Sequence, residues 1–205
     1  TDNFIAYCEE SGESIEVANV ISRLMRLRQI ALDPALIQLD GESPKTDWIL
    51  DYIKDNPDEP LIVFSQFTSY LNILYKKLGN KKCVLFTGQQ SKEAKFQAVQ
   101  DFQNGNVNVI LVNIVAGGVG ITLDRAVTCI FTDHVWSPYE REQAEARFLP
   151  TTKEMADSVR GVYYLFMENS VDYTLVSKMD MKNQSVINVN DVSRIIRKLK
   201  EGERK

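Results

Sequence analysis

The sequence is short of several residue types, and each shortage excludes a class of protein. Its three cysteines, Cys8, Cys83 and Cys129, include no Cys-x-x-Cys pair. An odd count without that spacing excludes a disulfide framework and a zinc ribbon, and it favours a reducing, intracellular compartment. The single histidine, His134, has no second histidine or suitable acid cluster to complete a metal site. No apolar run approaches the roughly 18 residues of a membrane span, so we expect no membrane partner.

Positive charge is also scarce. The chain carries 24 lysines and arginines against 28 acidic residues, a net charge of −4. That balance excludes a basic footprint over the whole domain. The positive charge gathers at the end, where residues 194–205 hold six basic residues and two glutamates. Two interpretations of this basic tail stay open: contact with phosphate, or the solvated end of a helix.

The remaining composition is that of a globular chain. Apolar residues make up 44% and charged residues 25% of 205 residues, enough to bury a core. The chain begins at Thr1 rather than methionine, which is typical of a segment of a longer protein.

Apolar residues three or four apart predict a helix over 14–32, ended by Asp33-Pro34. Ser43-Pro44 predicts the start of a second helix whose buried face includes Trp48 and Ile49.

From residue 60 onward, short apolar runs alternate with helical patterns. The runs fall at 61–64, 83–86, 107–112, 127–131 and 162–167, and the helical patterns at 67–78, 91–104, 138–149 and 170–182. Continuous apolar runs are typical of parallel strands that are buried on both faces. The alternation predicts an α/β fold with an open, mostly parallel sheet and helices on both faces.

Ligands of such sheets bind beyond the carboxyl ends of the strands, so the residues that follow each strand are the candidates. Ser65-Gln66 follows the first run, and Ser65 or Thr68 either caps the next helix or helps its amino terminus to hold an anion. Thr87-Gly88 follows the second run and forms either a tight turn or a close approach to a phosphate chain. Asn113 begins the stretch after the third run.

The richest stretch is 116–123, which holds three glycines in four positions, Gly117, Gly118 and Gly120, followed by Thr122. It is either a structural turn or one wall of a nucleotide site. It is not a Walker A loop, because no Gly-Lys-Ser/Thr triplet follows a strand anywhere in the chain. The chain therefore cannot cradle ATP alone in the P-loop manner.

A further candidate pair lies on the helix after Trp136-Ser137-Pro138. Gln143 and Arg147 are four residues apart, so both project from one helix face. An arginine in this place either reaches a phosphate with two N–H groups or pairs on the surface with Glu140 or Glu142.

These motifs, in this order, resemble the second RecA-like lobe of SWI/SNF-type ATPases of helicase superfamily two. The resemblance rests on Leu61 to Phe67, Phe86-Thr87-Gly88, 116–123, Trp136-Ser137-Pro138 and Gln143 to Arg147, and covers about 20–182. It implies a helical lead-in over 1–59 within the same lobe, a RecA-like lobe over 60–182, and a basic helix or tail over 183–205.

The resemblance also implies a function. Two RecA-like lobes of this family hold ATP and Mg²⁺ between them and move along nucleic acid, usually duplex DNA. The first lobe, absent from this chain, supplies most of the ATP and Mg²⁺ contacts, so the chain alone should be inactive. The implied catalytic residues are Arg147 and Gln143, and the implied nucleotide contacts are Gly118, Gly120 and Thr122. The implied nucleic-acid contacts are Ser65, Gln66, Thr87, Gly88 and Asn113.

Four positions depart from the family pattern. Pro150 stands at the second arginine position, Thr152-Lys153 replaces Gly-Gln, and Thr122 replaces asparagine. Because proline cannot bind phosphate, either Arg160 or another cation substitutes, or hydrolysis is weak, or the chain was altered at this position. The alternative function is therefore a degenerate lobe that binds nucleic acid or protein. A receiver-like domain is disfavoured because it needs a cluster of acids at the strand ends.

Overall fold

The computed structural model describes residues 14–79, 82–116, 120–133, 138–149, 160–168 and 170–172. The chain divides into two compact units, one of residues 42–166 and the other of residues 1–41 with 167–205. The predicted helix over 170–182 and the tail over 183–205 lie mostly or wholly outside the described residues. No helix in the described ranges is long and apolar enough to cross a membrane.

The smaller described part is the helical lead-in. Helix α2 spans Ser14–Leu32, as the spacing of apolar residues predicted, and a short 3-10 helix follows at Pro34–Ile37. Asp33 separates the two, and its carboxylate accepts a hydrogen bond from the N–H of Ala35 at 3.0 Å. The proline after Asp33 has no N–H to continue the helix, so the chain turns there.

The unit of residues 42–166 is built on five parallel strands. They are β1 (Leu61–Ser65), β2 (Cys83–Phe86), β3 (Val109–Asn113), β4 (Thr128–Phe131) and β5 (Gly161–Tyr164). Their order is β2-β3-β1-β4-β5, and every neighbouring pair is parallel. The predicted α/β sheet is confirmed, although β3 begins two residues later and β5 ends earlier than the apolar runs.

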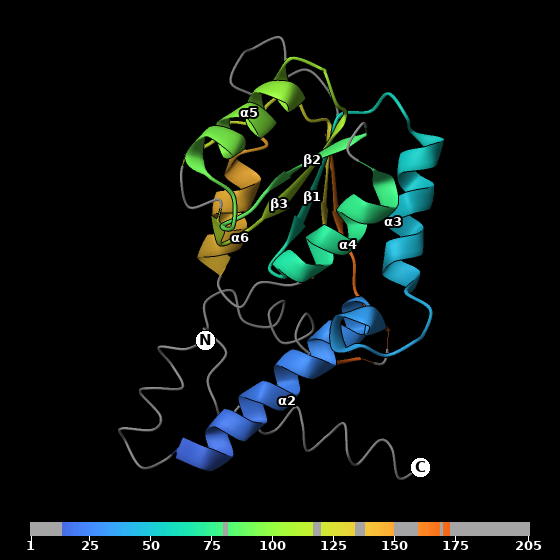
Figure 1. The fold of residues 1–205 in the computed structure, drawn as a ribbon, viewed down its shortest axis with the longest axis vertical. Coiled ribbons are helices and arrows are strands. Elements are labelled where there is room, and N and C mark those ends of the chain that lie inside the picture. Colours follow the sequence, from blue (N-terminus) through green and yellow to red (C-terminus); the bar gives the residue numbers. More distant parts are fainter. Residues whose placement is uncertain are drawn as a thin grey trace. The chain divides into compact units, whose positions relative to one another are not determined.

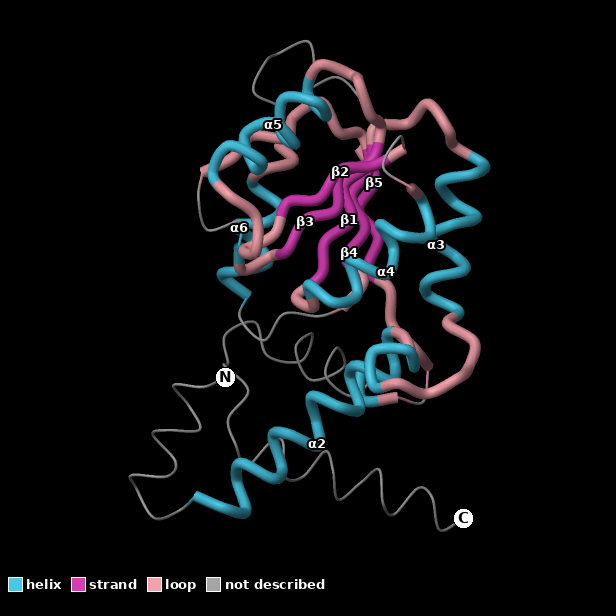
Figure 2. Tube along the Cα trace, in the orientation of Figure 1, coloured by secondary structure: helices cyan, strands magenta, loops and turns pink. Residues whose placement is uncertain are grey.

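Helices cover both faces of this sheet (Figure 1). They are α3 (Pro44–Asp55), α4 (Thr68–Leu78), α5 (Lys92–Gln103) and α6 (Pro138–Ala146). Helices α5 and α6 lie on one side of the strands, and α3 and α4 on the other; Figure 2 shows the strands between them. Ser43 caps α3 as predicted, with its hydroxyl accepting from the N–H of Thr46 at 3.4 Å.

The core follows from the alternation of side chains along the buried strands. Ile62 and Phe64 of β1 lie in one fully buried cluster with residues of α5 and α6, such as Phe102 and Ala144. Successive side chains of a strand point to opposite faces, so Leu61 and Val63 face the other helix layer. Fully burying side chains of this size contributes about 1.5–3 kcal/mol each, which fixes the strand register.

Two local predictions are wrong. No side chain caps α4: Phe67 holds the cap position, while Ser65 donates its hydroxyl to Asp133 and accepts from the N–H of Phe67 at 3.1 Å. Trp48 was predicted on the buried face of α3 but is 39% exposed. Its ring packs against Tyr52 and Tyr163 with centroids 5.3 and 5.6 Å away, so neighbouring aromatic rings rather than the core cover it.

Candidate nucleotide and nucleic-acid site

Polar side chains gather where β3, β1 and β4 end. Neighbouring parallel strands bring Ser65, Asn113 and Thr132 to one edge of the sheet. Together with Gln66 and Asp133 they form a set that we call the carboxyl-edge network. All are buried except Gln66, whose side chain is half-buried. The sequence-predicted residues Ser65, Gln66 and Asn113 are therefore brought together.

Asp133 is the hub of this network. Its carboxylate accepts hydrogen bonds from the hydroxyl of Ser65 at 2.6 Å and the hydroxyl of Thr132 at 2.9 Å. The backbone N–H of Gln66 donates to both carboxylate oxygens at 3.2 Å. Burying a carboxylate is costly unless donors satisfy it, and these three residues do so. The network thereby joins the end of β1 to the chain that leads into α6.

A buried lysine extends this network to helix α3. Lys45, 5% exposed, donates from its ammonium to the carbonyl of Thr132 at 2.9 Å. Neither Lys45 nor Asp133 was predicted to belong to the site. The available signals were an acid directly after a buried strand and a lysine in the first turn of a capped helix.

Asn113 shapes the beginning of the glycine-rich stretch. Its amide nitrogen donates to the carbonyl of Gln66 at 2.8 Å and the hydroxyl of Thr68 at 3.1 Å. Its amide oxygen accepts from the N–H of Ala116 at 3.0 Å. Asn113 thus ties the turn after β3 to the turn after β1.

Thr87 and Gly88 form the corresponding turn after β2. Thr87 is buried, and its N–H donates to the side-chain oxygen of Gln90 at 2.9 Å. Gly88 is exposed, and a Cβ built there would lie 3.9 Å from the Cβ of Ala116. The turn after β2 is therefore next to the beginning of the glycine-rich stretch, as a shared site requires.

Part of the glycine-rich stretch is described. Gly118 lies outside the described residues, whereas Gly120 and Thr122 are both exposed. No atom lies within 4 Å of a Cβ built on Gly120, so this backbone is open to a ligand. Both residues line a groove of about 740 Å³ along helix α5.

The candidate catalytic residues lie on and just after α6. Gln143 is exposed and donates from its amide to the hydroxyl of Tyr139 at 2.6 Å. Arg147 is half-buried, and its Nε donates to the carbonyl of Gln143 at 3.2 Å. Burial lowers the pKa of the Arg147 guanidinium, although its ordinary value is so high that the charge is kept.

Arg147 forms no ion pair with any residue that the structure describes, so the alternative pairing with Glu140 or Glu142 is absent there. The acid that does pair on this helix is Glu145, whose carboxylate lies 3.5 Å from Nε of Arg141. Glu145 also accepts the hydroxyl of Tyr164 in β5, which anchors α6 to the sheet edge. No described residue accepts a hydrogen bond from the terminal nitrogens of Arg147.

Arg160 does not supply the missing second cation in this arrangement. Its guanidinium donates to the carbonyls of Asp124 and Ala126, each at 2.9 Å, and to the carbonyl of Phe148. These bonds join β5 to the segment before β4 and to the turn after α6. Pro150 and Thr152-Lys153 lie outside the described residues.

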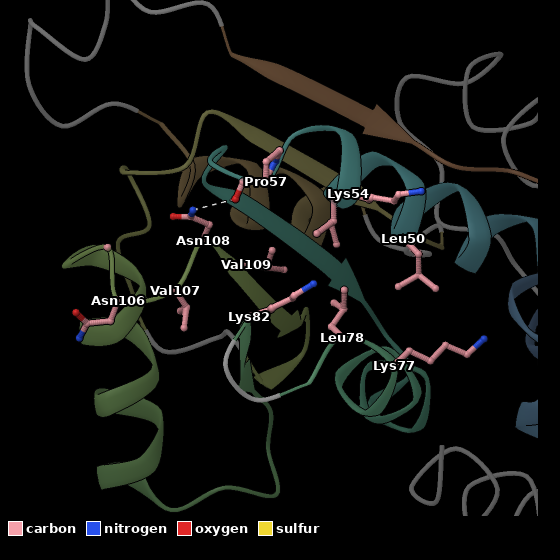
Figure 3. Close-up of a pocket in the computed structure, with 12 residues that line it drawn as sticks. Leu50, Lys54, Pro57, Lys77, Leu78, Lys82, Asn106, Val107, Asn108 and Val109 are labelled. Atoms are coloured by element: carbon pink, nitrogen blue, oxygen red, sulfur yellow. Dashed lines mark hydrogen bonds between the residues drawn. The ribbon is translucent and has the colours of Figure 1, made fainter.

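The described residues contain no group of three or more potential metal ligands. Asp133 is engaged with the network, so no free carboxylate pair for Mg²⁺ stands at this edge of the described structure. A second hollow, of about 460 Å³, lies at the other end of the strands, with Lys54, Lys77 and Lys82 along it (Figure 3). It contains none of the predicted site residues.

The comparisons with known proteins agree with this geometry. Residues 44–149, about half of the chain, match the family described as helicase conserved C-terminal domain. The chain belongs to this helicase family. The predicted RecA-like fold and the predicted likeness to SWI2/SNF2-type ATPases are thereby confirmed.

Among curated relatives, "DNA repair protein RAD5" of Candida albicans is 30% identical over 137 residues, 63% of this chain and 12% of that protein. "Putative ATP-dependent helicase/translocase YwqA" of Bacillus subtilis is 26% identical over 191 residues, 87% of this chain and 21% of that protein. The chain therefore spans a small part of the relatives that it matches.

Solved structures show the same fold. The "Sulfolobus solfataricus SWI2/SNF2 ATPase core in complex with dsDNA" has a TM-score of 0.68 at 23% identity, covering 93% of this chain and 43% of that one. The C-terminal domain of that ATPase alone has a TM-score of 0.64 at 23% identity, covering 86% of this chain and 75% of that chain.

Proposed function

We propose that this helicase-family lobe is the second motor lobe of an ATP-dependent DNA translocase. It would close on ATP and Mg²⁺ held mainly by a first RecA-like lobe and grip the backbone of duplex DNA. The observation that carries the proposal is Arg147, whose guanidinium just after the end of α6 has no acidic partner among the described residues. An intracellular location would follow from the DNA track.

Arg147 would act as an arginine finger. Negative charge on the oxygens of the transferred phosphoryl group must be neutralised in the transition state, and a guanidinium brought there by lobe closure does this. Gln143 would hold Arg147 through the carbonyl that accepts its Nε. Among the described residues only that N–H has a partner, and the other N–H groups of the guanidinium fork would bind phosphate.

The nucleotide and nucleic-acid residues divide by exposure. Gly120 and Thr122 are open to a ligand, and Gly118 completes the proposed nucleotide contact from the same stretch. Gln66 and Gly88 would contact the nucleic-acid backbone directly. Ser65, Thr87 and Asn113 are buried, so their part in binding is to hold the turns that carry Gln66 and Gly88.

The test is Arg147→Ala in a protein that contains this lobe and its first lobe. DNA-stimulated ATP hydrolysis should fall by about a thousandfold or more, as it does when arginine fingers are lost. Duplex DNA binding and thermal stability should stay near wild type, because Arg147 makes one side-chain hydrogen bond in the described structure.

Arg141→Ala is the matched control, since it removes the same charge from the same helix, from a side chain paired with Glu145. It should keep most of the hydrolysis. Equal losses in the two variants would rule out the finger role.

A second candidate function rests on Pro150, which stands where the family has a second arginine. A degenerate lobe would bind DNA or protein without turnover. DNA binding by the wild-type two-lobe protein, with no hydrolysis in the presence of Mg²⁺ and ATP, would favour this alternative.

A further inference from the structure

The groove along α5 has features that the motor proposal does not use. One helix face supplies residues at the spacing of a continuous stripe: Lys92, Lys95, Phe96, Val99, Gln100 and Gln103. Phe86 of β2 and Ile121 complete its apolar walls. The groove has a volume of about 740 Å³, and residues of α5 line one side of it. This volume leaves room for a planar aromatic ligand.

Phe96 is the unusual residue of this groove. Its side chain is 66% exposed, among the largest exposed fractions of any large apolar residue described. Leaving that ring in water forgoes the free energy of burial, about 25 cal/mol per Å² of apolar surface. Placed on the wall of a groove, the ring offers a stacking face to a ligand.

The charges of the groove are all positive. Lys92 and Lys95 line it, no acidic residue does, and neither lysine forms an ion pair within the described ranges. The ammonium of Lys95 lies 5.7 Å from the ring centre of Phe86, on the floor of the groove. Such a surface is complementary to a ligand that carries both negative charge and an apolar face.

The groove also carries unused hydrogen-bonding groups. The amide of Gln100 and the hydroxyl of Thr122 make no side-chain hydrogen bond within the described part of the chain. Gln103, by contrast, donates to Asp124 at 2.7 Å and closes that end. The Gln100 amide can therefore pair with the polar edge of a ligand whose face lies on Phe96.

We propose that this groove binds an unpaired nucleotide of the nucleic-acid track, with the base stacked on Phe96 and the adjoining phosphates near Lys92 and Lys95. Aromatic side chains beside cations are the common means of holding single strands. The position supports this assignment, because Phe86 directly precedes Thr87-Gly88, where the motor proposal places the nucleic-acid backbone. The inference rests on the proposed function, since it extends the same nucleic-acid contact to bases that leave the duplex.

The experiment uses the 205-residue chain and a fluorescein-labelled oligothymidine of about 12 nucleotides, within the usual range of single-strand site sizes. Anisotropy would measure the dissociation constant at several salt concentrations. Phe96→Ala should weaken binding about tenfold, the loss expected for one stacked base. Phe96→Trp should keep the affinity or increase it, whereas Phe96→Leu should behave like Phe96→Ala.

Lys92→Gln with Lys95→Gln should flatten the salt dependence. For single strands the slope of log K against log salt should change by about 0.7 for each lost phosphate contact, or about 1.4 for the pair. The matched control is Lys76→Gln with Lys77→Gln, an equal loss of charge in the last turn of α4, outside the groove. The control should keep both the affinity and the slope.

The outcomes separate this inference from the proposed function. Single-strand binding that ignores Phe96→Ala, or no binding of the oligothymidine at all, would overturn the groove assignment even if the two-lobe protein hydrolyses ATP with duplex DNA. Equal affinity of Phe96→Leu and wild type would also overturn it, since that result would mean that residue 96 supplies apolar contact without stacking. Loss of hydrolysis in Arg147→Ala tests the motor role and leaves the groove result unaffected.

Discussion

The carboxyl edge of the sheet and helix α6 both carry candidate functional residues, but they hold them in opposite ways. At the edge, Ser65 and Asp133 are buried and bonded to each other. On and just after α6, Gln143 is exposed and Arg147 half-buried, and within the described residues each side chain donates one hydrogen bond to a residue of α6, at 2.6 and 3.2 Å. The edge is therefore built in advance, whereas the α6 pair is left to complete its contacts with a ligand.

This difference suits a two-lobe motor. Residues that hold the turns must not move when the lobes separate, and buried networks with satisfied donors resist movement. An arginine finger must instead lose few existing contacts when it binds phosphate. Arg147 has no ion pair with an acidic residue to break in the described structure. Changes to the edge should thus alter folding stability, and changes to α6 should alter turnover.

The largest expected effect on stability comes from Asp133→Ala. It leaves the Ser65 hydroxyl and the Gln66 N–H without this acceptor, whereas the Thr132 hydroxyl keeps the carbonyl of Phe64 at 3.1 Å. Each lost partner costs about 1–3 kcal/mol, so we expect the free energy of unfolding to fall by about 3 kcal/mol or more. Urea unfolding of the 205-residue chain measures it.

Asp133→Asn is the control, because it keeps an oxygen for the two hydroxyls and loses the negative charge. It should cost less than Asp133→Ala. If Asp133→Ala is as stable as wild type, the carboxyl-edge network does not hold the fold together more firmly than α6 does.

A smaller effect should appear at alkaline pH. Burial raises the pKa of the Cys83 and Cys129 thiols to about 12 from an ordinary value of 9.0. The unfolded chain therefore loses these protons first, and the stability they contribute is complete below about pH 9 and is lost between about pH 9 and 12. Each thiol should lower the free energy of unfolding by up to about 1.4 kcal/mol per pH unit in that window.

The measurement is urea unfolding at pH 8, 9 and 10 for wild type and for Cys83→Ala with Cys129→Ala. The double variant should show a shallower decline with pH. The same decline in both proteins would assign the alkaline effect to other groups.

The sequence predicted the elements of the sheet better than the details of the site. Continuous apolar runs such as 61–64 have one stable place, a strand covered on both faces, and β1 was found there. Trp48 was misplaced because helical spacing alone does not say that Tyr163, more than a hundred residues later, would cover its ring. Contacts between distant elements have no local signal.

The same limit explains the missed network. Asp133 and Lys45 are far apart in the sequence, and only the packing of β4 beside β1 and α3 brings them to one edge. Motif spacing could name Ser65 and Asn113, because each directly follows a strand. It could not show that they are buried, which changes their expected part from contact to support.

The smallest expected effect on stability sharpens the comparison most. Gln143→Ala removes an exposed amide whose bond goes to Tyr139 on the same helix, so the free energy of unfolding should change by less than about 0.5 kcal/mol. DNA-stimulated hydrolysis by the two-lobe protein should still fall, by about tenfold, because the amide that we assign to the catalytic site is gone. The backbone carbonyl of residue 143, which holds Arg147, remains in this variant. Glu142→Ala, an exposed neighbour, should leave both quantities unchanged. A loss of stability as large as that of Asp133→Ala would mean that α6 is as firmly built as the carboxyl edge, and the division between a fixed edge and a poised helix would fail.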